Sequence, residues 1–132
     1  MIGKKNMAFG FLYFITTLAL GMYLGSKLGS GDATWAQSQQ RGILRAAHAH
    51  GNLESVLNIL IGYLLCRLQL DAWLAKTVSW LLIVGALFHS GMLYLGGFGY
   101  GFAFNLTPIG AISLISVMLL MGIGVIRLKE VH

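Results

Sequence analysis

The feature that most constrains this chain is a series of four apolar runs, each long enough to cross a lipid bilayer. They cover about residues 7–28, 42–66, 73–95 and 106–126. A helix needs about 20 mostly apolar residues to cross the hydrocarbon core. Backbone polar groups must be satisfied within each segment there, and the alternating pattern of membrane β-barrel strands is absent. The sequence therefore predicts an all-α, integral membrane four-helix bundle.

The composition points the same way. The chain has 132 residues, of which 57% are hydrophobic and 10% are charged, whereas a soluble domain carries about 25% charged residues. A chain of this length is one domain, over residues 1–132, and so much apolar surface on one small domain cannot be hidden from water. Cys66 is the single cysteine, so an internal disulfide is impossible.

The net charge of +5 does not indicate nucleic-acid binding, because the basic residues flank the apolar runs instead of gathering on one surface. With four spans, both termini lie on one side of the membrane. The side of the termini carries Lys4, Lys5, Arg67, Lys76, Arg127 and Lys129, and the other side carries Lys27, Arg41 and Arg45. Cytoplasmic segments are enriched in Lys and Arg. We therefore expect a multi-pass protein of a bacterial-type inner membrane with cytoplasmic termini.

The first run contains three glycines at intervals of four residues, Gly21, Gly25 and Gly29. Small residues at this spacing let membrane helices approach closely. The close contact lies either within the bundle or between protomers.

The second run is the most polar, and its ionisable residues are candidates for function. Inserting a charged residue at the centre of a span costs about 2.5–3.5 kcal/mol, so ionisable residues there usually have a function. At about 100° per residue the polar groups fall on two faces of a helix. One face carries His48, Asn52 and Ser55, and the other carries His50, Glu54 and Asn58. Two polar faces require two polar neighbours, which hints at a homo-oligomer.

A histidine in the third run lies at a matching depth. His48 is six residues in from Gly42, and His89 is six residues in from Leu95. At 1.5 Å per residue, both lie about 9 Å below the same membrane face. Histidines at equal depth on antiparallel helices could meet or flank one cofactor, whereas His48 and His50, two residues apart, point roughly opposite ways.

Among cofactors, haem fits these residues best, because it needs only one or two axial histidines and an apolar slot. Aromatic and methionine side chains are present to line a slot, namely Trp80, Phe88, Met92, Tyr94 and Phe98. Zinc is disfavoured, because the chain has no H-E-x-x-H motif and no thiolate set. A proton path through histidine and Glu54, without any cofactor, is also reasonable chemistry for a span.

The opening of the second run also resembles a known family. An arginine, two alanines and a histidine, from Arg45 to His48, are followed six residues later by a polar residue, Glu54. This pattern resembles the styrene oxide isomerases, which are small four-helix membrane proteins that form trimers and hold haem b between protomers. The glycine- and aromatic-rich segment before the last run is also similar. The resemblance implies that His48 is the axial ligand of the haem iron.

The chain departs from the family's pattern at several positions. Glu54 stands where the family has asparagine, and two alanines replace one in the motif. His50 and His89 have no expected counterpart in the family. Tyr94 is the nearest candidate for a tyrosine that helps to hold the substrate there. Asn52 and Asn58 are further candidates for binding the cofactor, together with the histidines.

Three functions therefore stay open. The resemblance implies epoxide-to-aldehyde isomerisation of a small hydrophobic substrate at ferric haem, with His48 on the iron and Glu54 and Tyr94 orienting the substrate. The alternative is a cytochrome b-type electron-transfer protein, in which His48 or His50 shares one haem with His89. The third is a cofactor-free membrane protein with a proton site at Glu54 and His50.

Overall fold

The computed structural model describes residues 1–128, and every regular element among them is helical. The long helices are α1 (Lys4–Gly29), α3 (Gln39–Arg67), α4 (Ala72–Phe88), α5 (Ser90–Gly97) and α6 (Thr107–Ile126), with a short α2 (Ala33–Ala36) and a 3-10 helix η1 (Gly101–Asn105) between them. The prediction of an all-α chain is confirmed for these residues. Lys129, counted above for orientation, lies outside them.

Three stretches of residues 1–128 are long and apolar enough to cross a membrane. They are Lys4–Gly29, Ala72–Gly97 and Gly101–Ile126. The 29-residue α3 is not among them, because it carries the polar residues of the second run. Its length is sufficient for a span, so its place in a membrane depends on how its polar groups are satisfied by the neighbouring helices.

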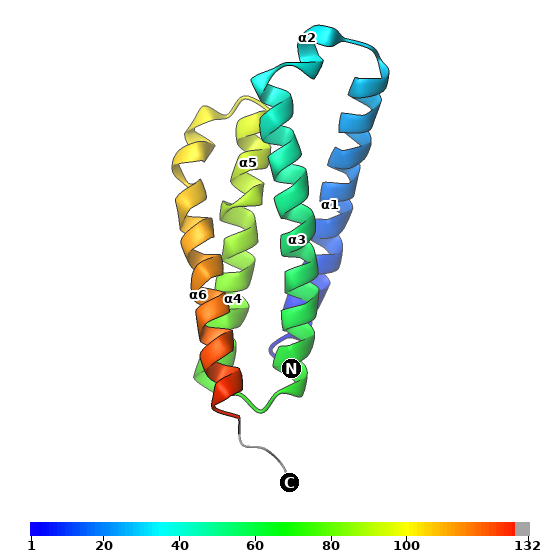
Figure 1. Ribbon diagram of the computed structural model, residues 1–132. Helices are drawn as coiled ribbons and strands as arrows, with labels where there is room; N and C mark the ends of the chain where they lie inside the picture. Colours follow the sequence, from blue (N-terminus) through cyan, green and yellow to red (C-terminus); the bar gives the residue numbers. More distant parts are fainter. Residues whose placement is uncertain (129–132) are drawn as a thin grey trace.

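The long helices run alongside one another, with α3 between α1 and the α4–α5 pair (Figure 1). α6 comes close to α4, α5 and η1, while its backbone, over the described part of the chain, approaches neither α1 nor α3. The helices therefore do not close into a ring: α1, α3 and α4 form a compact unit, and α6 flanks it. α1 begins at the end of the molecule where α6 ends (Figure 1).

The outward faces of the flanking helices are apolar. On α1, Phe11 and Ile15 are 60% and 63% exposed, and on α6 Ile112 and Ile115 are 64% and 69% exposed. Inside, an apolar cluster joins α3, α4 and α6 and includes the fully buried Leu82. Apolar side chains both inside and outside suit a protein whose surroundings are lipid.

The third apolar run is not one continuous helix as predicted, because it breaks at His89. The backbone there has φ −94° and ψ −84°, which ends α4 and begins α5. Sharp bends of this kind occur at Gly/Ser pairs, and Ser90 and Gly91 follow the break. Ser90 Oγ also lies 3.2 Å from the Ala86 carbonyl oxygen of the preceding turn, a contact typical of serines where helices bend.

A buried group of polar side chains ties α1, α3 and α4 together. The Asn6 amide donates to the Ser79 carbonyl at 2.8 Å and to Asn58 Oδ1 at 3.3 Å. The Ser79 hydroxyl donates to Asn6 Oδ1 at 2.5 Å, and the Asn58 amide donates to the Leu82 carbonyl at 3.4 Å. The side chains of Asn6, Asn58 and Ser79 are fully buried. Since no water reaches them, these bonds fix how the three helices are placed.

We expect Asn6→Ala to destabilise the protein by about 1–3 kcal/mol, because it leaves the buried groups of Ser79 and Asn58 without their partner. Ser116→Ala is the matched control, since that exposed hydroxyl bonds only to the Ile112 carbonyl of its own helix. The control should change stability by less than about 0.5 kcal/mol. Unfolding by SDS titration in mixed micelles measures both, and equal stabilities of the two variants would contradict the role of Asn6.

Candidate functional site

The polar residues of α3 point in two directions, as its periodicity predicts. His48 and Asn52 lie toward α1, and His48 Nδ1 is 2.8 Å from the Thr17 carbonyl. His50 and Glu54 lie toward α4 and α5, where Glu54 meets His89. The chain therefore has two separate polar sites on opposite sides of α3. The expected meeting of His48 with His89 is wrong, because His50 takes that place.

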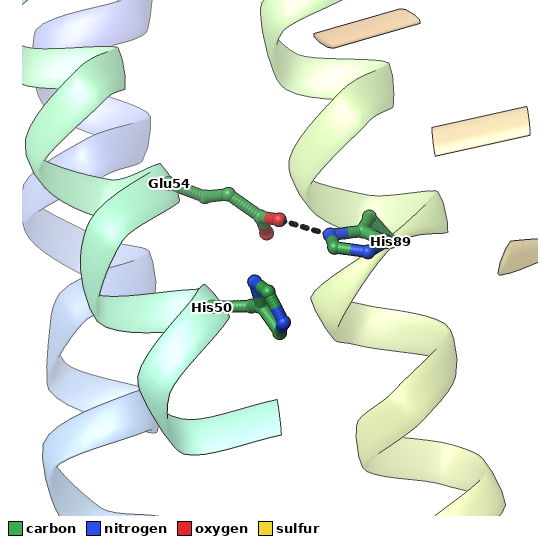
Figure 2. Close-up of side chains that lie close together, drawn as sticks. All are labelled: His50, Glu54 and His89. Carbon is green, nitrogen blue, oxygen red and sulfur yellow. Dashed lines mark hydrogen bonds and ion pairs between the residues drawn. The ribbon is translucent and has the colours of Figure 1, made fainter. Parts of the chain in front are cut away.

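The site toward α4 and α5 contains His50, Glu54 and His89, and we call these residues the histidine–glutamate cluster (Figure 2). His89 Nδ1 lies 2.6 Å from Glu54 Oε1. The rings of His50 and His89 are in edge contact, with centroids 4.7 Å apart. One possible ligand atom from each residue lies within 4.8 Å of the others. Glu54 is buried, His89 is partly buried and His50 is exposed, so the cluster opens outward at His50.

The Glu54 carboxylate is held from a second direction. Its Oε2 accepts a hydrogen bond from the Ser90 hydroxyl. The Tyr13 hydroxyl of α1 lies 2.7 Å from Ser90 Oγ and 3.3 Å from the Ala86 carbonyl. A chain of contacts thus runs from α1 through Ser90 to the cluster. Glu54 is only 2% exposed, so these bonds replace the water that its carboxylate lacks.

Ser90 and Tyr13 were missed by the sequence reasoning. The break at His89 explains Ser90: successive side chains of an intact helix diverge by about 100°, whereas here both His89 and Ser90 reach the same carboxylate. The Ser-Gly pair after His89 was the available signal for the break. For Tyr13 there was none, because nothing local distinguishes it from the aromatic residues around it.

The site toward α1 is built around His48. Its ring lies over Gly21 of α1, where an added Cβ would be 2.6 Å from His48 Cε1. Because a carbonyl oxygen only accepts, the bond to Thr17 places the proton on Nδ1 and leaves Nε2 with its lone pair. That lone pair accepts a hydrogen bond from the Asn52 amide, whose nitrogen lies 3.3 Å from Nε2. Gly21 thus belongs to a helix contact within the chain, while no atom of residues 1–128 outside their own helix lies within 4 Å of a Cβ added at Gly25 or Gly29.

His48 also lines a shallow open depression on the outer side of α3. Its other lining residues are small or basic, namely Gly42, Arg45, Ala46 and Ala49. Asn52, whose amide nitrogen contacts His48, has a buried side-chain oxygen with no hydrogen-bond partner among residues 1–128. An unpaired buried oxygen calls for an explanation in a native structure, and a catalytic or binding role is one.

These observations fit a haem axial ligand at His48. An axial histidine typically donates its second ring N–H to a carbonyl, which fixes the ring and directs the other nitrogen to the metal. His48 has that arrangement with Thr17. Small residues allow a flat macrocycle to approach α3 closely, and the exposed guanidinium of Arg45 suits a propionate.

Other predicted site residues lie elsewhere. Asn58 lies one turn beyond Glu54, where its amide donates to the Glu54 backbone carbonyl at 3.0 Å, and its side chain belongs to the buried group with Asn6. The Tyr94 hydroxyl donates to the Thr16 carbonyl at 3.2 Å, beside a second open depression between α1 and α5. Glu54 turns to His89 and Ser90 and not to His48. The resemblance implies that His48, Glu54 and Tyr94 surround one substrate, but in the structure they lie in three different places.

The aromatic residues proposed to line a slot are not gathered around one. Trp80 is 61% exposed and lies under Lys5, whose Nζ is 3.5 Å from the ring centroid. Phe98 packs against Tyr23 and Tyr94 instead. Composition alone cannot show which aromatic residues of a span face a site, because most of them contact lipid or neighbouring helices.

We expect Gly21→Ala to be less stable than Gly25→Ala by about 1–3 kcal/mol, the usual effect of overpacking a close contact. The added methyl group must displace the His48 ring from the Thr17 carbonyl, whereas open space surrounds Gly25. Thermal unfolding in one detergent compares the two variants, which make the same chemical change four residues apart. Equal stability would show that the ring moves aside without loss.

Comparisons with known proteins identify a family but no activity. No curated protein matches the chain, and no solved structure does. A family model described as a domain of unknown function, DUF8059, matches residues 3–131. The match includes all the long helices and the residues of both sites on α3. The chain therefore belongs to the DUF8059 family.

Proposed function

We propose that this chain is an integral membrane protein of four spans that binds haem b through His48. The three long apolar stretches support the membrane location, and α3 supplies the fourth span because its polar groups meet partners on its neighbours. The end of the molecule where α1 begins carries Lys4, Lys5, Arg67, Lys76 and Arg127. This excess of basic residues favours cytoplasmic termini in a bacterial-type inner membrane.

The observation that carries the haem proposal is the orientation of His48. Its Nδ1 is held by the Thr17 carbonyl at 2.8 Å, and its Nε2 accepts from the Asn52 amide of the same helix. The Asn52 oxygen has no hydrogen-bond partner among residues 1–128. The resemblance to the styrene oxide isomerases singles out the same histidine. Because the depression beside His48 opens outward, a second protomer would cover a bound haem, which supports a homo-oligomer such as the trimer of that family.

A single axial histidine is favoured over a bis-histidine site. His48 and His89 lie on different sides of α3, toward α1 and toward α5. The rings of His50 and His89 have centroids 4.7 Å apart. With metal–nitrogen bonds of about 2 Å, two imidazoles on opposite sides of one iron would have centroids more than about 6 Å apart. The electron-transfer alternative therefore has less support than a site with one free axial position.

A haem held by His48 alone would suit binding or catalysis. When bound, ferric haem b supplies a Lewis acid that can polarise an epoxide oxygen, the chemistry implied by the resemblance. The chain's own part is to fix His48 through Thr17 and to offer the Asn52 side chain beside it. Glu54 lies on the other side of α3, so in this proposal Asn52 takes the place near the iron ligand that the resemblance would give to Glu54.

Purified protein from haem-replete expression should show a Soret band and, after dithionite reduction, b-type α and β bands. His48→Ala should lower haem content per chain at least about tenfold, since losing even an outer-shell partner typically costs 10–100-fold in metal affinity. His50→Ala is the matched control two residues away and should keep its haem. Colourless wild-type protein would overturn the proposal and favour the cofactor-free alternative.

If the haem serves isomerisation, wild-type protein should convert an aryl epoxide to the aldehyde, followed by gas chromatography. His48→Ala should lose the activity together with its haem. Asn52→Leu should lower the rate by about 10–100-fold while haem stays bound, because it removes only the polar group beside the ligand. A haem-loaded protein that leaves the epoxide unchanged would reject isomerisation while haem binding stands.

A further inference from the structure

From the histidine–glutamate cluster we infer a second metal site, in which His50, Glu54 and His89 bind one divalent transition-metal ion such as Zn²⁺. Two imidazole nitrogens and one carboxylate oxygen form the three-ligand set of catalytic zinc and of mononuclear iron sites. One such atom from each residue lies within 4.8 Å of the others. This site is independent of His48 and does not rest on haem.

The spacing requires only small movements for an ion to bind. Ligands about 2.0–2.1 Å from a tetrahedral ion are about 3.4 Å from one another. His89 Nδ1 and Glu54 Oε1 are closer than this, at 2.6 Å, and no pair in the cluster exceeds 4.8 Å. Rotation of the exposed His50 side chain, together with a slight separation of Glu54 from His89, makes the three distances equal.

Sequence spacing places two of these residues together, and the fold adds the third. His50 and Glu54 are four residues apart on α3 and therefore share one face, the spacing by which helices supply paired metal ligands. The third ligand comes from the break between α4 and α5, where His89 faces that pair (Figure 2). Zinc was disfavoured from the sequence because the chain has no H-E-x-x-H motif and no thiolate set, whereas this set takes its third ligand, His89, from another helix and needs no thiolate.

Burial and charge favour a cation here. Glu54 is 2% exposed, and among residues 1–128 its sole ion-pair partner is His89. A buried carboxylate without a strong counter-charge is costly, and the cost is greatest within a span. A divalent ion would supply that charge. The nitrogen ligands select a transition metal over Ca²⁺ and Mg²⁺, which prefer oxygen ligands.

Surrounding bonds orient the ligands. The Ser90 hydroxyl holds Glu54 Oε2, and Tyr13 holds Ser90 from α1. Glu54 Oε1 faces His89 Nδ1 at 2.6 Å, and a bound ion would take the place of the proton between these two atoms. Outer partners of this kind set the direction of a ligating carboxylate. Because His50 is exposed, the fourth coordination position faces outward, where a water molecule or a small ligand can enter.

The test is metal binding by the full chain in detergent, with any affinity tag removed and bound metal stripped by a chelator. Zn²⁺ is titrated by calorimetry and counted by mass spectrometry, and Co²⁺ is added separately to reveal the visible bands of a tetrahedral site. We expect about one ion per chain in wild type. His50→Ala and Glu54→Gln should each weaken binding at least about 10–100-fold, the range known even for outer-shell changes.

The controls separate this site from the haem site and from misfolding. His48→Ala should bind Zn²⁺ as wild type does, although it loses haem. His50→Ala changes an exposed side chain and is expected to fold even if Glu54→Gln does not. Wild-type protein without stoichiometric zinc, or His50→Ala with unchanged affinity and an unchanged Co²⁺ spectrum, would overturn the inference.

Discussion

The structure depends on the need to satisfy polar side chains that are buried between apolar helices. Where water is absent, each such group must find its partner on a neighbouring helix, and this fixes which helices meet and at what depth. The Asn6 amide joins α1 to α4 at the end of the molecule where α1 begins. The Glu54 carboxylate joins α3 to both residues at the start of α5. Apolar packing alone would let these helices slide along one another.

Glycines allow the polar contacts to form. A Cβ atom at Gly110 of α6 would collide with the backbone at His89. Because glycine has no Cβ, α6 can come close to the place where the α4–α5 helix is broken. Gly21 makes room for the His48 ring in the same way, and Gly51 does so for the Thr17 side chain. The break and the His48 bond to Thr17 therefore both depend on residues without side chains on the facing helix.

Much of the fold could be predicted from the sequence, because helix length and periodicity are local properties. The four apolar runs correspond to α1, α3, α4–α5 and α6, and the two polar faces of α3 follow from 3.6 residues per turn. The partner of each face could not be predicted. Equal depth suggested that His48 meets His89, but depth gives position along a helix and not direction around it. His50 lies two residues after His48, at about the same depth, and its side chain points toward His89.

The polarity of α3 makes its position dependent on the rest of the chain. The stretches α1, α4–α5 and η1–α6 are apolar enough to cross a membrane by composition, and α3 is not. Three of its polar side chains are met by residues of other helices: His48 by Thr17, Glu54 by His89 and Ser90, and Asn58 by Asn6. If α3 spans the membrane as proposed, it is stable there only once these partners are in place. Insertion of α3 then requires the contacts of both candidate sites to be formed. Sequence changes that disturb either site are therefore expected to affect folding as well as chemistry.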